Sequence, residues 1–162
     1  MNSIAEPAAR RTVNSAGPGS LHRGNLGQKL DDQMSELISS FRELRVYQLA
    51  FKLQQRVFNV SKSFPVEERY SLTDQIRRAS RSVGANISEA WQKRRYPALF
   101  INKLTDSAGE QSEMQHWLET ARACEYISDR ERLEMLNDCQ RIGQMLGTMI
   151  SKPEKFCHGR GV

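Results

Sequence analysis

Apolar side chains recur every three or four positions from residue 41 to residue 151, which is the period of an amphipathic α-helix. Proline interrupts this pattern at Pro65 and Pro97 and ends it at Pro153. We therefore expect four helices, at about residues 40–62, 67–95, 98–125 and 128–151. Because short breaks place successive helices antiparallel, the pattern predicts an all-α fold, an antiparallel up-down-up-down four-helix bundle.

Two of these helices begin with capping-box sequences. Ser40 and Glu43 stand three residues apart, as do Ser128 and Glu131, so that each hydroxyl and carboxylate can satisfy unpaired helix N–H groups. Gly84 lies inside the second helix, where it costs about 1 kcal/mol relative to Ala and predicts a kink or a close helix contact. Small residues at 107–109 predict a close approach of a neighbouring helix.

The same spacing predicts which residues face the core. In the first helix they are Val46, Leu49, Ala50, Leu53, Val57 and Val60. In the second helix they are Leu72, Ile76, Ala79, Val83, Ile87 and Ala90. In the third helix they are Phe100, Leu104, Ala108, Gln111, Leu118 and Ala121. In the fourth helix they are Leu133, Leu136, Cys139, Gly143, Leu146 and Ile150.

Several helices carry a second apolar face beside these core stripes. Deep burial in one bundle accounts for a wide apolar arc, but its recurrence in a small bundle favours a homo-oligomer. The expected oligomer-interface residues are Tyr47, Phe51, Phe58, Trp117, Met135, Ile142 and Met149.

The chain outside the periodic region has a different composition. Residues 1–28 are rich in Gly, Ser, Asn, Ala and Pro and contain no aromatic residue, so we expect a disordered leader at 1–39, with a helical turn or two within 30–40. The bundle is expected at 40–152 and a flexible tail at 153–162. Three widely spaced cysteines without an export signal or an apolar run of membrane-spanning length predict a cytoplasmic protein with no membrane partner.

Charge is distributed unevenly along the predicted bundle. Residues 41–95 carry 12 Lys and Arg against 5 Asp and Glu, whereas residues 96–151 carry 5 against 9. A basic face suits an anionic polymer, and it equally suits an acidic face of another subunit. The candidate nucleic-acid-binding residues are Arg69, Arg77, Arg78, Arg81, Lys93, Arg94 and Arg95.

Other polar residues are assigned to structure rather than to catalysis. Asn86 would fix helix register through hydrogen bonds, and Glu89 would pair with a basic group on another helix or subunit. Glu113 and His116 match a local Glu-x-x-His motif, but a bundle metal centre needs this motif on two helices. We expect no metal, cofactor or catalytic group, because the sequence also lacks phosphate loops, dinucleotide turns and nucleophile triads.

Several segments in order resemble one protein family. They are FRELRVYQLAFKL (41–53), SFPVEERYSLTDQIRRASRSVGANISEA (63–90), the helix from Leu99 to Leu118, and RIGQML (141–146). These segments are similar to the four-helix-bundle family also called the 23S rRNA intervening-sequence or S23 family. The positions that match its pattern are Tyr70, Leu72, Gln75, Ile76, Arg77, Arg78, Asn86, Ile87 and Glu89.

The resemblance implies a small bacterial bundle that assembles into a ring, commonly a pentamer, without known enzymatic activity. The family is also similar to the accessory variability protein of diversity-generating retroelements, a basic pentameric barrel that binds a reverse transcriptase and nucleic acid. Such a reverse transcriptase, or another protein, is therefore a candidate partner. This chain departs from the family at Ala90 and Glu125, where Gly is common, and at Glu110, where Ser is common.

Together these patterns predict a non-enzymatic homo-oligomeric binding or scaffold protein that holds RNA or DNA on the basic face of its second helix. The alternative is a protein-interaction adaptor whose arginines serve subunit assembly, without nucleic-acid binding. A metal-dependent enzyme is a third hypothesis, and it requires stoichiometric bound metal.

Overall fold

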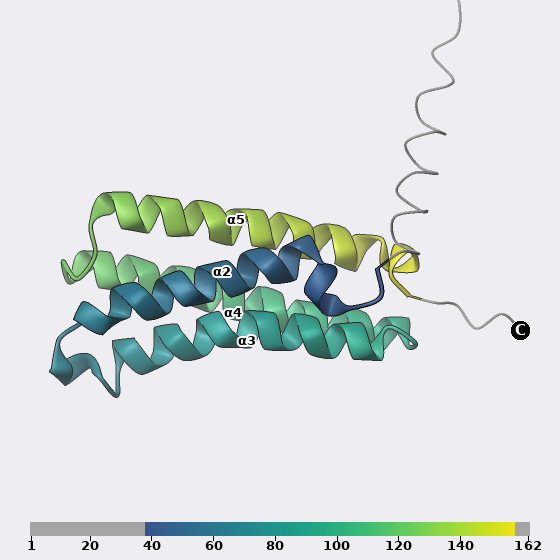
Figure 1. Cartoon of the computed structure of the whole chain (residues 1–162), viewed down its shortest axis with the longest axis horizontal. Helices are drawn as coiled ribbons and strands as arrows, with labels where there is room; N and C mark the ends of the chain where they lie inside the picture. Colours follow the sequence, from purple (N-terminus) through teal and green to yellow (C-terminus); the bar gives the residue numbers. More distant parts are fainter. Residues whose placement is uncertain (1–37, 158–162) are drawn as a thin grey trace, which may run out of the picture.

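The computed structural model of the chain describes residues 38–157 (Figure 1). This part contains no strand, and its long helices are α2 (Arg45–Val60), α3 (Leu72–Lys93), α4 (Pro97–Ala123) and α5 (Asp129–Ser151). Each helix packs against the next in the chain, and α2 closes the bundle against α5 (Figure 1). The predicted antiparallel four-helix bundle is therefore confirmed. None of the described helices is long and apolar enough to cross a membrane.

Short 3₁₀ turns flank these helices. They are η1 (Phe41–Glu43), η2 (Ser61–Ser63), η3 (Val66–Glu68) and η4 (Pro153–Lys155). The predicted capping box at Ser40 and Glu43 is present, but it caps η1, and extended backbone at Leu44 separates this turn from α2. The first helix is consequently shorter than the expected range of 40–62. The second capping box, at Ser128 and Glu131, begins α5 as predicted.

The predicted core faces of α2, α3 and α4 largely pack inside the bundle, whereas that of α5 is partly wrong. The buried side chains of α5 are Met135, Cys139, Ile142, Leu146 and Met149. Leu133 is 57% exposed instead, and Leu136 and Gly143 are only half-buried. These three residues line a polar surface groove between α4 and α5. Cys139 and Leu146 are buried as predicted, and the rest of the core face of α5 is supplied by the neighbouring stripe, Met135, Ile142 and Met149.

Close approach between helices occurs at two of the predicted places. A Cβ at Gly84 would meet the Tyr47 ring at 3.6 Å, so Gly84 marks a contact with α2 inside an unbroken α3. Ser107 donates a hydrogen bond of 2.9 Å to the backbone carbonyl of Val83, which joins α4 closely to α3. At Gly109 no atom of a neighbouring helix lies within 4 Å of the position that a Cβ would occupy, so the expectation of a close neighbour is wrong there.

The chain reverses direction after α4 through a left-handed residue. Glu125 has a φ of 60°. Its N–H donates a 3.0 Å hydrogen bond to the carbonyl of Arg122, and the N–H of Tyr126 donates a 2.9 Å hydrogen bond to the carbonyl of Ala121. This pair of bonds is a Schellman motif, in which the left-handed residue is usually Gly. Glu125 therefore holds strained backbone at the position where the resembling family often has Gly.

The packed region continues beyond the boundary expected at residue 152. Residues 153–157 form η4 and the following turn, and the Phe156 ring stacks on Phe100 with centroids 6.2 Å apart. The expectation of a flexible tail is therefore wrong for these five residues. The expectations for residues 1–37 and 158–162 lie outside the described residues.

Candidate nucleic-acid interface

Because one side of α3 is buried in the bundle, the residues on its other side face the solvent. Its core residues recur from Leu72 to Ala90 at helical spacing, and all are buried. Arg78 and Arg81 lie on the other side of the helix and are exposed. Since they are three residues apart, they are neighbours on the helix surface.

Arg77 does not belong to this exposed face. Its guanidinium lies 4.9 Å from the centroid of the Phe58 ring, and its Nε donates a 2.7 Å hydrogen bond to Ser61 Oγ. The side chain therefore covers the junction between α2 and α3. Arg77 is therefore a predicted phosphate-binding residue whose side chain is engaged in packing between two helices.

Lys93 and Arg94, at the end of α3, are engaged within the chain in the same way. The Lys93 ammonium pairs with Glu89 at 2.5 Å. The Arg94 guanidinium stacks 4.1 Å from the Trp91 ring centroid and donates a 2.8 Å hydrogen bond to the Trp91 carbonyl. Both side chains are half-buried, so their cations are less available to a partner.

The remaining four predicted residues are exposed, and we call them together the α3 arginine face: Arg78 and Arg81 on α3, with Arg69 just before it and Arg95 just after it. Arg78 donates a 3.1 Å hydrogen bond to Gln75, a neutral partner on its own helix. Among the described residues, none of the four makes an ion pair with a carboxylate. None of the four charges is neutralised by an ion pair in the described part of the chain, although the charge of Arg78 acts on Glu110 of α4 and tends to lower its pKa.

Two exposed tyrosines, which were not among the predicted binding residues, lie next to arginines of this face in the sequence. Tyr70 is 86% exposed and follows Arg69, whereas Tyr96 is 50% exposed and follows Arg95. The two Arg-Tyr pairs bracket α3, whose 22 residues span about 33 Å. Repetition of the same dipeptide at both ends of one helix is the sequence signal that could have identified them.

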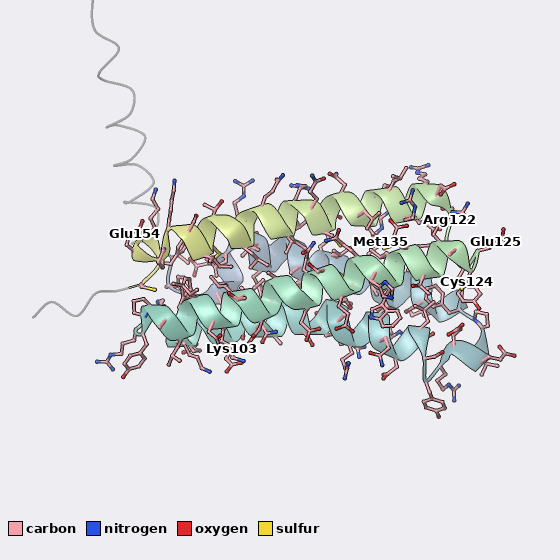
Figure 2. All side chains as sticks on the ribbon, turned by 180° about the vertical axis from the view of Figure 1, so that it is seen from behind. Lys103, Arg122, Cys124, Glu125, Met135 and Glu154 are labelled. Atoms are coloured by element: carbon pink, nitrogen blue, oxygen red, sulfur yellow. The ribbon has the colours of Figure 1, made fainter. Side chains whose placement is uncertain are left out.

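Several carboxylates of the acidic helices, by contrast, are paired with arginines of the same chain. Arg122 pairs with Asp129 at 2.7 Å, Arg132 pairs with Glu119 at 3.0 Å, and Arg56 and Arg130 both pair with Glu134. Hydrogen bonds from Arg130 and Arg56 lower the pKa of Glu134, and those from Arg122 lower the pKa of Asp129. Figure 2 shows Arg122 at the end of α4 near the connection to α5. Asp129 and Glu134 of α5 are therefore already paired and do not neutralise the exposed arginines of α3.

The two residues predicted to be structural behave differently. Glu89 pairs with Lys103 of α4 at 3.1 Å, and hydrogen bonds from Lys93 and Lys103 lower its pKa. Figure 2 shows Lys103 on the side of α4 nearest α3, so the predicted contact of Glu89 with a basic group on another helix is confirmed. The Asn86 side chain is half-buried and has no hydrogen-bond partner among the described residues. Its predicted hydrogen bonds are therefore not present in this part of the chain.

Buried polar groups elsewhere fasten the helices to one another. Gln111 is buried and donates a 2.8 Å hydrogen bond to the Cys139 carbonyl, which links α4 to α5. The Ser107 hydroxyl makes the corresponding link from α4 to α3. Burial raises the pKa of the Cys139 thiol to about 12, so this cysteine stays protonated and unreactive near neutral pH.

The predicted oligomer-interface residues do not form one surface. Met135, Ile142 and Met149 are at most 4% exposed, because they fill the core of a single chain; their assignment to a subunit interface is corrected here. Three others, Tyr47, Phe58 and Trp117, are half-buried. Phe51 is 48% exposed and stacks on Tyr47 with centroids 6.2 Å apart, so it remains the most accessible of the predicted interface residues.

The Glu-x-x-His motif of α4 is occupied by local contacts. Glu113 accepts a 3.0 Å hydrogen bond from Trp117 Nε1, and the His116 ring meets the Trp117 ring edge-on at 4.7 Å. Burial, followed by the charge of Glu113, raises the pKa of Glu110. No group of three or more His, Cys, Asp or Glu residues in the described region could hold a metal ion.

The fold and this surface define the class of the protein, a small all-α bundle with an exposed arginine face on its second long helix. The chain belongs to the 23S rRNA-intervening sequence protein family, whose model matches residues 42–148. It is also similar to a crystal structure of a protein of unknown function from the S23 ribosomal protein family of Bacteroides thetaiotaomicron VPI-5482. That likeness has 29% identity and a TM-score of 0.60 and covers 75% of this chain and 98% of that chain. No curated protein matches the chain.

Proposed function

We propose that this protein is a cytoplasmic, non-enzymatic homo-oligomer, pentameric as its family resemblance implies, that binds RNA or DNA on the α3 arginine face. The observation that carries the proposal is the exposed pair Arg78 and Arg81, which has no carboxylate partner among the described residues. Guanidinium groups bind phosphate oxygens bidentately. A symmetric assembly would repeat a weak patch and convert it into a stronger, multivalent surface.

The two exposed tyrosines support a nucleic-acid partner. Aromatic rings stack on the faces of unpaired bases, and nearby arginines hold the phosphates. Tyr70 and Tyr96 stand beside Arg69 and Arg95, so each end of the α3 arginine face combines both groups. The family name links its members to 23S rRNA, which makes structured RNA the first ligand to test.

A protein-interaction adaptor is the second candidate, and a specific observation favours it. Glu110 and Glu113 lie on α4 and have no ion-pair partner among the described residues. Burial raises the pKa of Glu110 and so disfavours its charged form, and the charge of Arg78 in the same chain offsets this only in part. Arginines of a second copy would neutralise these carboxylates, and the α3 arginine face would then serve assembly.

One experiment separates the two candidates. Binding of labelled structured RNA, duplex DNA and single strands is measured across a salt series for the native chain and for Arg78→Gln with Arg81→Gln. We expect affinity for at least one ligand to fall steeply with salt, with a log–log slope of about 0.9 per phosphate neutralised on duplex DNA. The double substitution should weaken binding and reduce the slope by about 2 for each engaged subunit.

The matched control is Arg130→Gln with Arg141→Gln, which removes the same charge from α5. These arginines pair with Glu134 and Asp138 and lie outside the α3 arginine face. The control should leave the salt slope nearly unchanged, and light scattering should give all three proteins the same mass. If the native oligomer binds no nucleic acid at low salt, or if only the α3 substitutions dissociate it, the adaptor interpretation replaces the proposal.

A further inference from the structure

An apolar groove opens at the end of the bundle where both ends of the described chain lie. It has a volume of about 490 Å³ between the start of α2 and the end of α5. We call it the end groove, and its apolar wall consists of the half-buried Ile38, Met145 and Phe156 above the buried Leu44, Val46 and Met149. Grooves of this size are large enough to enclose several side chains. Because apolar surface in water is unfavourable, a cover over this groove would stabilise the protein.

The chain itself approaches the groove along its edge. Ile38 is the first described residue and already forms part of the wall, so residue 37 is attached directly beside it. In the sequence immediately before it, LDDQMSEL at 30–37, Leu30, Met34 and Leu37 are spaced four and three apart. In a helix these three side chains share one face, and Ile38 continues the same stripe. The apolar stripe is thus continuous with a residue already in the groove.

Charge also matches between this sequence and the rim. Residues 30–37 contain Asp31, Asp32 and Glu36 and no basic residue. Arg45 lines the groove and is exposed, without a carboxylate partner among the described residues. The acidic residue of the lining, Glu43, is already held by Ser39 and the Ser40 N–H at 2.8 and 3.1 Å. Arg45 is therefore a cation at the rim of the groove that is available to pair with a carboxylate of residues 30–37.

We propose that residues 30–37 dock in the end groove of the same chain as a short amphipathic helix, with Leu30, Met34 and Leu37 against its apolar wall. Eight helical residues are about 12 Å long, and a helix of this length does not persist alone in water. Its formation therefore depends on packing in the groove. This inference concerns a surface away from the α3 arginine face and does not rest on the proposed function.

The six methionines of the chain make the test specific, because they can be labelled with ¹³C-methyl groups in the intact protein. Met34 lies on the segment, Met145 and Met149 line the groove, and Met114 and Met135 lie in the core. We expect a nuclear Overhauser contact between the Met34 methyl and that of Met145 or Met149. Substitution of Leu30→Ser with Leu37→Ser should remove it and shift the Met145 and Met149 resonances.

Two comparisons complete this test. Ser35→Gln changes a polar position outside the apolar stripe of the proposed helix and should leave the contact intact, while unchanged Met114 and Met135 resonances show that each variant is folded. Co-expression of Met34→Leu chains with chains carrying Met145→Leu and Met149→Leu detects contacts between copies only. A contact in that mixture overturns own-chain docking in favour of a second copy's segment. The proposal is overturned if Met34 makes no contact and if Leu30→Ser with Leu37→Ser leaves the Met145 and Met149 resonances unshifted.

Discussion

The arginines in α3 and directly after it were all predicted to bind phosphate, but they lie in different environments in the fold. Arg81 is exposed, Arg77 covers the Phe58 ring, and Arg94 stacks on Trp91. The Nε of Arg94 and Nε1 of Trp91 are buried without a hydrogen-bond partner among the described residues, which shows how deeply this pair is packed. Substitution at Arg77 or Arg94 would therefore mix effects on folding with effects on binding. Arg78 and Arg81 are the informative positions for a binding test.

The strained backbone at the end of α4 gives a prediction for a single residue. Glu125→Gly should raise the free energy of unfolding by about 1 kcal/mol, because Gly adopts the left-handed conformation of the Schellman motif without a Cβ clash. Part of the gain is offset by the greater entropy of Gly in the unfolded chain. Denaturant unfolding followed by circular dichroism measures the change.

The neighbouring residue Ala123 provides the control for this substitution. It is the last residue of α4 and is exposed, so Ala123→Gly should lower the free energy of unfolding. Opposite signs for two changes to Gly, two residues apart, would identify the backbone conformation as the cause. A destabilising Glu125→Gly would show instead that the Glu125 side chain contributes more than its backbone costs.

At the scale of the helix, periodicity predicted the existence and inward faces of α2, α3 and α4 well. It was only partly right on α5, where Cys139 and Leu146 are buried as predicted but Leu133 and Leu136 are not, because apolar residues there occupy two adjoining stripes. The structure buries the stripe through Met135, Ile142 and Met149, since this side faces α2 and α4. A wide apolar arc indicates that a helix is buried, but its neighbours decide the orientation.

The glycines inside α4 and α5 give a prediction for these elements. No atom of a neighbouring helix lies within 4 Å of a Cβ placed on Gly109 or Gly147. Gly109→Ala and Gly147→Ala should each raise the free energy of unfolding by about 0.8–1.0 kcal/mol through helix propensity. Thermal and denaturant unfolding measure the gain.

Gly84→Ala serves as the contrast to these two substitutions. Its Cβ would contact the Tyr47 ring at 3.6 Å, so the propensity gain should be smaller there. If Gly109→Ala or Gly147→Ala instead destabilises the protein and lowers its oligomeric mass, another subunit must approach that glycine.

At the scale of the whole molecule, Phe51 is the most exposed of the predicted oligomer-interface residues that are not buried in the core. Its side chain is 48% exposed and stacks on the half-buried Tyr47, whose ring lies against Gly84 of α3. If the protein is a homo-oligomer built through this face, light scattering should give a multiple of 18.6 kDa, five times that mass for a pentamer. Phe51→Ser should reduce this mass because it removes apolar contact area.

Val66→Ser is the matched control, since Val66 is 68% exposed at the end of the bundle. It should leave the mass unchanged. A monomeric native protein would contradict the oligomer itself, and an undiminished mass for Phe51→Ser would move the interface to another face. The polar α4–α5 groove, which includes Leu133, is then the next surface to examine.

The sequence by itself determined the helix count, the helix breaks, both capping boxes and the family, because these depend on local spacing and on segments read in order. It also identified the excess of basic residues over residues 41–95. Only the tertiary structure decided which apolar stripe of α5 is buried, that residues 153–157 pack onto the bundle, and which arginines stay unpaired within the described chain. These outcomes depend on contacts such as Arg77 with Phe58 and Phe100 with Phe156, which join residues far apart in the chain and leave no periodic signal in the sequence.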